Sequence, residues 1–178
     1  MRSKTIISLT IICALLVGGV WYLYTRTVDV DDGAITSFEE CAQYYAVMES
    51  YPARCATKSG KSFTQDIGNE LEKTNLIHID TPRPTATVSS PLLVSGMARG
   101  YWFFEASFPV ELRDEAGTVI AQGIAQAGSE WMTEDFVPYS VTLTFTQPTT
   151  KNGTLTLHKD NPSGDPVHDD ALVVPVEF

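Results

Sequence analysis

Residues 104–113, which read FEASFPVELR, decide the fold of this chain. Apolar residues recur at every second position, and polar residues fall between them. A period of two is typical of a β-strand with one buried face, because successive side chains point to opposite faces of a sheet. Pro109 lies on the polar side, which predicts an edge strand or a bulge. The side chains expected to face the core are those of Phe104, Ala106, Phe108, Val110 and Leu112.

The same period recurs on both sides of this strand. Residues 114–117 (DEAG) form a turn signal, and the hairpin partner is expected over residues 118–125. Further strands are expected at residues 77–79, 92–98, 137–145, 154–159 and 172–178. About seven short strands, each with one apolar face, predict an all-β domain over residues 77–178. Two sheets packed face to face would bury all of these faces, and a small barrel is the alternative.

The N-terminal segment predicts where the chain lies in the cell. Residues 5–24 read TIISLTIICALLVGGVWYLY and carry no charge. At about 1.5 Å per residue such a helix spans roughly 30 Å, the thickness of a bilayer's hydrocarbon layer. Arg2 and Lys4 precede it, aromatic residues end it, and acidic residues follow. This pattern predicts a single-pass signal-anchor with residues 1–4 in the cytoplasm and the rest outside the cell membrane. The alternative, a cleaved signal peptide, needs a small-x-small cleavage site, which does not follow here.

A small cysteine-containing module is expected over residues 37–65, behind a polar tether at 25–36. Ser37 and Glu40 form a capping-box pattern, which predicts a short helix from Phe38 to about Tyr45. Residues 66–76 are polar and are expected to link the module to the strands.

Cys41 and Cys55 are the two cysteines beyond the apolar segment. In an exported protein such a pair predicts a disulfide, and closing a loop of about 15 residues stabilises by roughly 3 kcal/mol. A metal site is the alternative, but no histidine lies between or beside these cysteines, so no metal is expected.

Several stretches of the strand region also resemble a known family. They are residues 90–98 (SPLLVSGMA), 104–114 (FEASFPVELRD), Gly117, 153–155 (GTL) and 174–178 (VPVEF). In this order they resemble the immunoglobulin-like domain family of bacterial spore germination. The resemblance implies an immunoglobulin-like β-sandwich on a bacterial surface, and it carries over no catalytic, cofactor or ligand residues. Residues 37–65 are similar to a short module of bacterial envelope proteins.

The charge of the chain excludes one class of partner. The chain carries a formal charge of −10, and Arg2 and Lys4 are the only charged residues among the first 24. The remainder therefore holds 10 basic against 22 acidic residues, a net charge of −12. Such a surface repels phosphate backbones, so no nucleic-acid partner is expected.

Motifs for enzyme chemistry are missing from the sequence. It contains no Gly-x-Ser-x-Gly, no His-Glu-x-x-His and no glycine-rich phosphate loop. His168 stands beside Asp169 and Asp170, but neighbours in a polar loop need not face one another. Residues 160–170 (DNPSGDPVHDD) are rich in oxygen ligands, yet their spacing does not match a calcium loop. No catalytic residue and no cofactor is therefore expected.

The aromatic run at residues 100–103 (GYWF) is the candidate binding feature. Tyr101 and Trp102 are candidates for an exposed platform that would receive a sugar ring or the apolar surface of a partner. Alternatively, they cap the sandwich or pack on the cysteine module. Trp131 and Met132 are weaker candidates of the same kind.

These patterns together predict a non-enzymatic, membrane-anchored module of a bacterial envelope. Its domain would bind cell-wall polymer, a neighbouring protein or another cell. A structural subunit assembled through the membrane helix is one alternative, and an accessory hydrolase with an unrecognised site is another.

Overall fold

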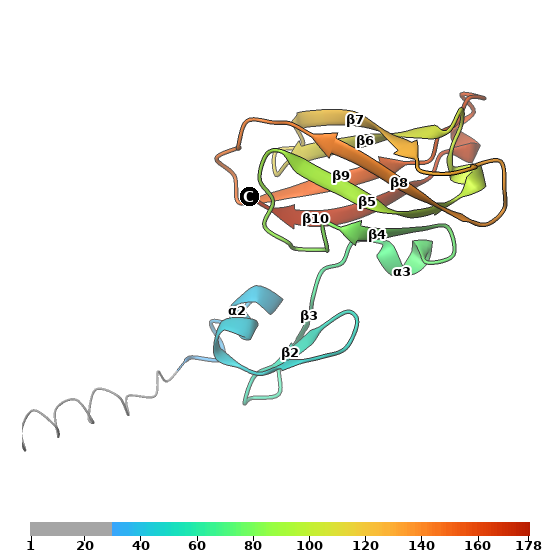
Figure 1. Ribbon diagram of the computed structural model, residues 1–178. Helices are drawn as coiled ribbons and strands as arrows, with labels where there is room; N and C mark the ends of the chain where they lie inside the picture. The colour runs from blue at the N-terminus through green and yellow to red at the C-terminus, as the bar shows by residue number, and fades with distance from the viewer. Residues whose placement is uncertain (1–29) are drawn as a thin grey trace, which may run out of the picture. The chain divides into compact units, whose positions relative to one another are not determined.

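The computed structural model describes residues 30–178, which belong to two compact units (Figure 1). Residues 30–48 and 55–63 belong to the first unit, and residues 49–54 and 64–178 form the second. This division differs from the predicted boundaries. Residues 49–54 were predicted to belong to the cysteine-containing module and residues 66–76 to a linker, but both segments belong to the same unit as the strands. The predicted membrane segment at 5–24 lies outside the described residues. Among residues 30–178, no helix is long and apolar enough to cross a membrane.

The smaller unit is built around helix α2 (Phe38–Tyr44). The Ser37 hydroxyl accepts a hydrogen bond from the Glu40 backbone N–H at 3.1 Å, so the predicted helix start is confirmed. Three short strands pair in the order β1 (Val47–Met48), β2 (Arg54–Ala56) and β3 (Ser62–Thr64).

The larger unit is a seven-stranded sheet, so the all-β prediction is confirmed. It begins with the short helix α3 (Glu70–Lys73), within the expected linker. The strands are β4 (Ile77–Thr81), β5 (Leu92–Arg99), β6 (Ser107–Asp114), β7 (Val119–Ala127), β8 (Phe136–Leu143), β9 (Asn152–His158) and β10 (Ala171–Glu177). Two 3₁₀ turns, η1 (Gly100–Trp102) and η2 (Pro166–His168), lie between them.

The strands form one hydrogen-bonded sheet in the order β10-β9-β6-β7-β8-β5-β4. All of its strand pairs are antiparallel. Strands β7 and β8 pair only at Gln126 and Ala127, where the β10-to-β7 half joins the β8-to-β4 half. Beyond this joint, a Cβ atom on Gly123 of β7 would come within 2.8 Å of the Val141 side chain of β8. One continuous core contains buried side chains from all seven strands, so the sheet curls around it into a nearly closed barrel.

The core consists of the inward side chains of every strand. Phe108 lies at its centre and stacks edge-to-face on Phe103 and Tyr139, with ring centroids 5.1 and 5.0 Å apart. The largest fully buried side chains are those of Trp102, Phe108, Ile77, Ile79, Leu112, Leu143, Leu155, Leu157 and Leu172, with valines 94, 110 and 137.

Strand β6 differs from its prediction in two ways. It begins at Ser107, because Glu105 and Ala106 have positive φ angles of 49° and 61° and turn the chain. Phe104 is therefore outside the strand and 41 % exposed. The expectation of an edge strand at Pro109 is also wrong, since β6 lies between β9 and β7. Pro109 is tolerated because the ladder to β9 ends one residue later, at Val110.

The outer edge of β10 is covered by two earlier segments of the chain. Residues 85–88 run beside it and exchange backbone hydrogen bonds with Pro175 and Glu177. Further along, the Asn69 side chain accepts from Val173 N–H and donates to the Ala171 carbonyl, at 2.8 and 2.9 Å. This edge is therefore paired over most of its length.

Tyr139 ties three neighbouring strands together. It lies opposite Gly96 in the pairing of β8 with β5, and its hydroxyl donates to the His78 carbonyl of β4 at 2.9 Å. Burial raises the pKa of the Tyr139 hydroxyl, with smaller contributions from the charges of Asp80 and Glu70. A Cβ atom at residue 96 would fall 2.6 Å from that hydroxyl oxygen, so only glycine leaves room for the tyrosine.

Candidate functional site

Three loops meet at one end of the seven-stranded sheet. They join β5 to β6 (residues 100–106), β7 to β8 (128–135) and β9 to β10 (159–170). Gly100 N–H donates to the Asp135 carbonyl at 3.1 Å, and Asp160 N–H donates to the Trp102 carbonyl at 3.0 Å. Gly100 also packs so closely on the carbonyls of Trp131 and Thr133 that no side chain fits there. We call this surface the loop end.

The loop end exposes large apolar side chains. The exposed fractions are 50 % for Tyr101, 41 % for Phe104, 75 % for Met132 and 75 % for Val167. Trp131 is partly buried and packs against the core. Four such side chains on three neighbouring loops favour a recognition surface, because single exposed apolar residues on a soluble domain are usually scattered.

Trp102 is not part of this surface. It is 0 % exposed, so the expectation that it forms an exposed platform with Tyr101 is wrong. The reason is the 3₁₀ turn η1, which directs the side chains of Trp102 and Phe103 into the core and leaves Tyr101 in solvent. Of the two aromatic residues expected to form the platform, Tyr101 is the one that remains accessible.

Phe104 and Val167 were not predicted to lie at this surface, for different reasons. Phe104 continues the alternation of β6, and the turn that removes it from the strand contains neither glycine nor asparagine. Positive φ at two consecutive non-glycine residues costs on the order of 1 kcal/mol each. Backbone hydrogen bonds between Phe104 and Ser107, at 3.0 and 3.1 Å, hold this turn in place. Val167 could have been noticed as the one aliphatic side chain in the otherwise polar stretch 160–170.

The loop end is strongly acidic. Its three loops contain eight carboxylates and one lysine, Lys159, which gives a formal charge of −7. The carboxylates are those of Glu105, Glu130, Glu134, Asp135, Asp160, Asp165, Asp169 and Asp170. The loops at the opposite end of the sheet (82–91, 115–118 and 144–151) contain Arg83, Lys151 and Glu115, a formal charge of +1. Of the two ends of the sheet, the acidic one is therefore the end at which these apolar side chains are exposed.

The loop 159–170 is held by its own polar groups. Asn161 donates to the Asp169 carboxylate at 2.7 Å, Asp165 caps η2 by accepting from Val167 N–H at 3.1 Å, and Asp170 pairs with Lys73. Asp169 and Asp170 are thus engaged by groups other than His168. In residues 30–178, no three His, Cys, Asp or Glu residues are grouped so as to hold a metal ion.

A polar depression of about 680 Å³ lies beside this loop. Asn69, His158 and Asn161 are among the residues that line it. Asn69 and Asn161 already use their amides to hold the β10 edge and the loop, so these groups stabilise the fold around the depression.

Glu111 organises the outer face of β6. Burial opposes its ionisation, but hydrogen bonds from Arg113 and Gln122 outweigh burial and lower the pKa of this carboxyl. The distances to Arg113 Nη2 and Gln122 Nε2 are both 2.7 Å, and His158 Nε2 lies 3.8 Å away. The Glu111 carboxylate is therefore ionised and held in place by these hydrogen bonds, which suits a structural role.

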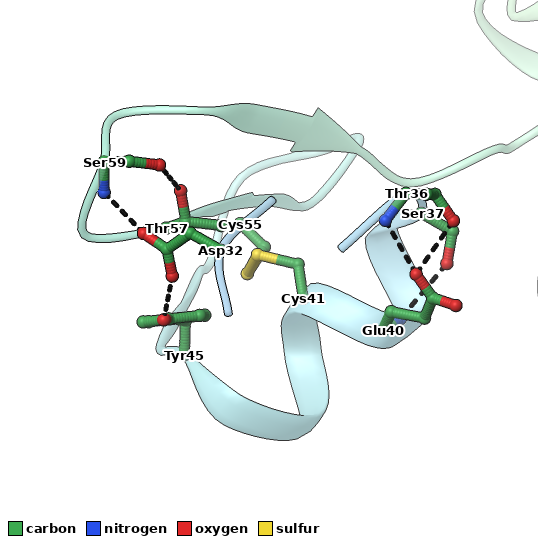
Figure 2. The surroundings of a disulfide bond; sticks show 9 residues. All are labelled: Asp32, Thr36, Ser37, Glu40, Cys41, Tyr45, Cys55, Thr57 and Ser59. Carbon is green, nitrogen blue, oxygen red and sulfur yellow. Dashed lines mark hydrogen bonds between the residues drawn. A yellow bond between two sulfur atoms is a disulfide. The ribbon is translucent and has the colours of Figure 1, made fainter. Parts of the chain in front are cut away.

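The disulfide predicted between Cys41 and Cys55 is present at the centre of the smaller unit (Figure 2). Both cysteines are fully buried and pack with Ile35. Figure 2 shows two hydrogen-bonded groups around the bond. In one, Asp32 accepts from the Tyr45 hydroxyl and from Ser59 N–H, and in the other Glu40 accepts from Thr36.

These hydrogen bonds lower two pKa values. The Tyr45 hydroxyl and then the Ser59 N–H lower the pKa of Asp32, and the backbone N–H of Thr36 does the same for Glu40. Both carboxylates serve as acceptors that close loops, so they serve the unit's structure.

A second polar cluster lies in the larger unit, where Glu70 is buried. It accepts from Arg83 Nη1 at 2.8 Å and from the Tyr51 hydroxyl. Arg83 also stacks over the Tyr51 ring at 5.3 Å. Burial and the neighbouring Glu70 carboxylate raise the pKa of Tyr51 to about 12. Because Tyr51, Glu70 and Arg83 are far apart in the chain, no sequence spacing pointed to this cluster.

One family model matches the chain, that of the immunoglobulin-like domain of bacterial spore germination, over residues 76–165. The match covers β4 to β9 and includes Tyr101, Phe104 and Met132 of the loop end. Comparisons with curated proteins and with solved structures found no match.

Proposed function

Because this chain belongs to the family of immunoglobulin-like domains of bacterial spore germination, we propose that it is a non-enzymatic binding module of the bacterial envelope. The binding surface is the loop end, and the apolar segment at residues 5–24 anchors the chain in the cell membrane with residues 30–178 outside. The family is one of immunoglobulin-like domains and not a recognised enzyme family.

The observation that carries this proposal is the exposure of Tyr101, Phe104, Met132 and Val167 on a well-paired framework. In immunoglobulin-like domains the loops cluster at the ends of the sheets, and a rigid framework can present them to a partner. Here backbone hydrogen bonds of Gly100 and Asp160 fasten the loops to one another. The surface is thus ordered before binding, which reduces the entropy lost on association.

Two observations support a location outside the cytoplasm. The Cys41–Cys55 disulfide is buried and fits an oxidising compartment. Residues 5–24 have the length and flanking charges of a signal-anchor, with Arg2 and Lys4 on the cytoplasmic side.

A pull-down tests the proposal. The full chain, with its disulfide intact and in neutral detergent, is incubated with purified cell-wall sacculi and separately with solubilised envelope proteins. We expect retention by one of them, and loss of retention in the double variant Tyr101→Ala with Met132→Ala. The matched control is Leu93→Ala, which removes a half-exposed apolar side chain from the face of β5.

Retention that survives the Tyr101 and Met132 substitutions would move the binding surface away from the loop end. Failure of both sacculi and envelope proteins to retain the chain would reject a binding function and favour a subunit assembled through its membrane helix.

A further inference from the structure

We propose that the loop end binds a lysine- or arginine-containing segment of a partner polypeptide. This inference rests on the proposed function and names the class of its partner. The exposed apolar side chains would receive the aliphatic stems and apolar residues of that segment, and the surrounding carboxylates would receive its cationic groups.

The apolar part of the surface fits long cationic side chains. Lysine and arginine carry three or four methylene groups below the charge, and these groups pack on apolar surface while the charge stays in water. Tyr101 and Phe104 also present aromatic rings, which attract cations over their faces. The chain already makes such contacts internally, since Arg99 stacks on the ring of Phe136 at 4.0 Å, at the base of the same loops.

The charge of the surface selects a cationic partner. The loop end carries −7 and the opposite end +1, so an approaching chain of positive charge is steered toward Tyr101 and Met132. Among the basic groups near these loops, Arg99 donates to the Asn75 and Glu134 carbonyls, and Lys73 pairs with Asp170. Carbonyls do not neutralise the Arg99 charge, so Arg99 and Lys159 stand against the seven carboxylates other than Asp170, and the surface remains strongly negative.

Other ligands fit the surface less well. No group of three or more potential metal ligands occurs in the described part of the chain. A neutral sugar could stack on the tyrosine ring and donate hydroxyl hydrogen bonds to carboxylates, but it would leave the negative charge of the surface uncompensated. A second copy of this chain would bring a net charge of the same sign. A basic polypeptide segment uses both the apolar and the acidic components.

The experiment uses the full chain in neutral detergent and three fluorescently labelled synthetic peptides. The first alternates lysine and leucine, the second has every lysine acetylated, and the third has glutamate in place of lysine. Anisotropy titrations give the dissociation constants at low and at physiological salt. We expect the lysine peptide to bind at least about tenfold more tightly than the other two, and to weaken as salt rises.

Two variants locate the site and two control for it. Tyr101→Ala with Met132→Ala, and Glu134→Gln with Asp135→Asn, should each weaken binding of the lysine peptide at least about fivefold. Ile124→Ala and Glu115→Gln change an exposed apolar and an acidic side chain elsewhere, and should change it less than about twofold. Circular dichroism confirms that each variant is folded.

Equal binding of the three peptides, or equal effects of the site and control variants, would overturn the inference. So would retention on sacculi without any binding of the lysine peptide, although the proposed binding function would then stand. Loss of every interaction would reject both proposals.

Discussion

Replacing Gly96 by alanine should destabilise the larger unit more than any conservative change on its surface. A Cβ atom there would lie 2.6 Å from the Tyr139 hydroxyl oxygen and closer still to the His78 carbonyl oxygen. Both groups are held by the pairing of β5 with β8 and β4, so neither can retreat without disturbing a ladder. The new methyl group therefore pushes apart two strands and breaks the hydrogen bond between Tyr139 and His78.

The expected loss combines two costs and one gain. Overpacking a well-packed site costs about 1–3 kcal/mol. Losing a buried hydrogen bond and leaving its partner unsatisfied costs a further 1–3 kcal/mol or so. Alanine restores roughly 0.4–1 kcal/mol by restricting the unfolded chain. The free energy of unfolding should therefore fall by about 1–5.5 kcal/mol, which at roughly 4 °C per kcal/mol lowers the melting temperature by about 4–22 °C.

Urea and thermal unfolding, followed by tryptophan fluorescence, measure this loss. Trp102 is fully buried and Trp131 packs against the same core, so the change in tryptophan emission on unfolding reports on the core of this unit. Tyr139→Phe is the matched control, because it removes only the hydroxyl and should cost about 1 kcal/mol. The two substitutions combined should cost less than the sum of their separate effects, since they share one contact. A Gly96→Ala protein within about 0.5 kcal/mol of the parent would refute the packing argument, because that is the range of an ordinary surface change.

Three further predictions concern the polar and covalent links. Replacing both Cys41 and Cys55 by serine should remove roughly 3 kcal/mol from the smaller unit, seen as faster hydrogen exchange in α2, and unchanged exchange would contradict this. The pKa of Glu111 is lower in the folded than in the unfolded protein, so ionised Glu111 stabilises the fold above its unfolded pKa, and this stabilisation is lost as pH falls through its folded pKa. The urea midpoint of unfolding should therefore drop in acid, and Glu111→Gln should reduce that drop. The pKa of Tyr51, about 12, lies above its ordinary value near 10, so its contribution is present below pH 10 and is lost as pH rises toward 12. Phenolate absorbance should then show a group that titrates near pH 12 and that Tyr51→Phe removes, and an identical titration of the variant would argue against the cluster with Glu70.

The strands were largely predictable from the sequence, because a period of two with turn residues between the runs is compatible with few structures besides paired strands. β4, β5, β7, β9 and β10 lie within a few residues of their expected positions. The start of α2 was equally clear, since Ser37 and Glu40 satisfy a local rule. Each of these features is set by residues that are close together in the sequence, so a short sequence pattern is enough to predict it.

The errors occurred where distant contacts or unusual backbone decide the outcome. Nothing in the sequence distinguishes Phe104 from the other members of the alternation, because its turn uses Glu105 and Ala106 in place of glycine. The burial of Trp102 beside the exposed Tyr101 depends on how η1 enters the core. The single sheet in place of two depends on the short joint between β7 and β8 at Gln126. None of these properties has a short sequence signature.

The side chain of Asn69 has a consequence for how this protein avoids aggregation. An open strand edge is a template on which another chain can add, and repeated addition builds cross-β fibrils. Asn69 presents an acceptor to Val173 and a donor to Ala171, as the backbone of a neighbouring strand would. It precedes β10 in the chain, so during synthesis the protecting amide is made before the edge that it covers. Asn69 thus blocks the part of the β10 edge that residues 85–88 leave open, and it does so with one uncharged side chain. It is already present when this last strand forms.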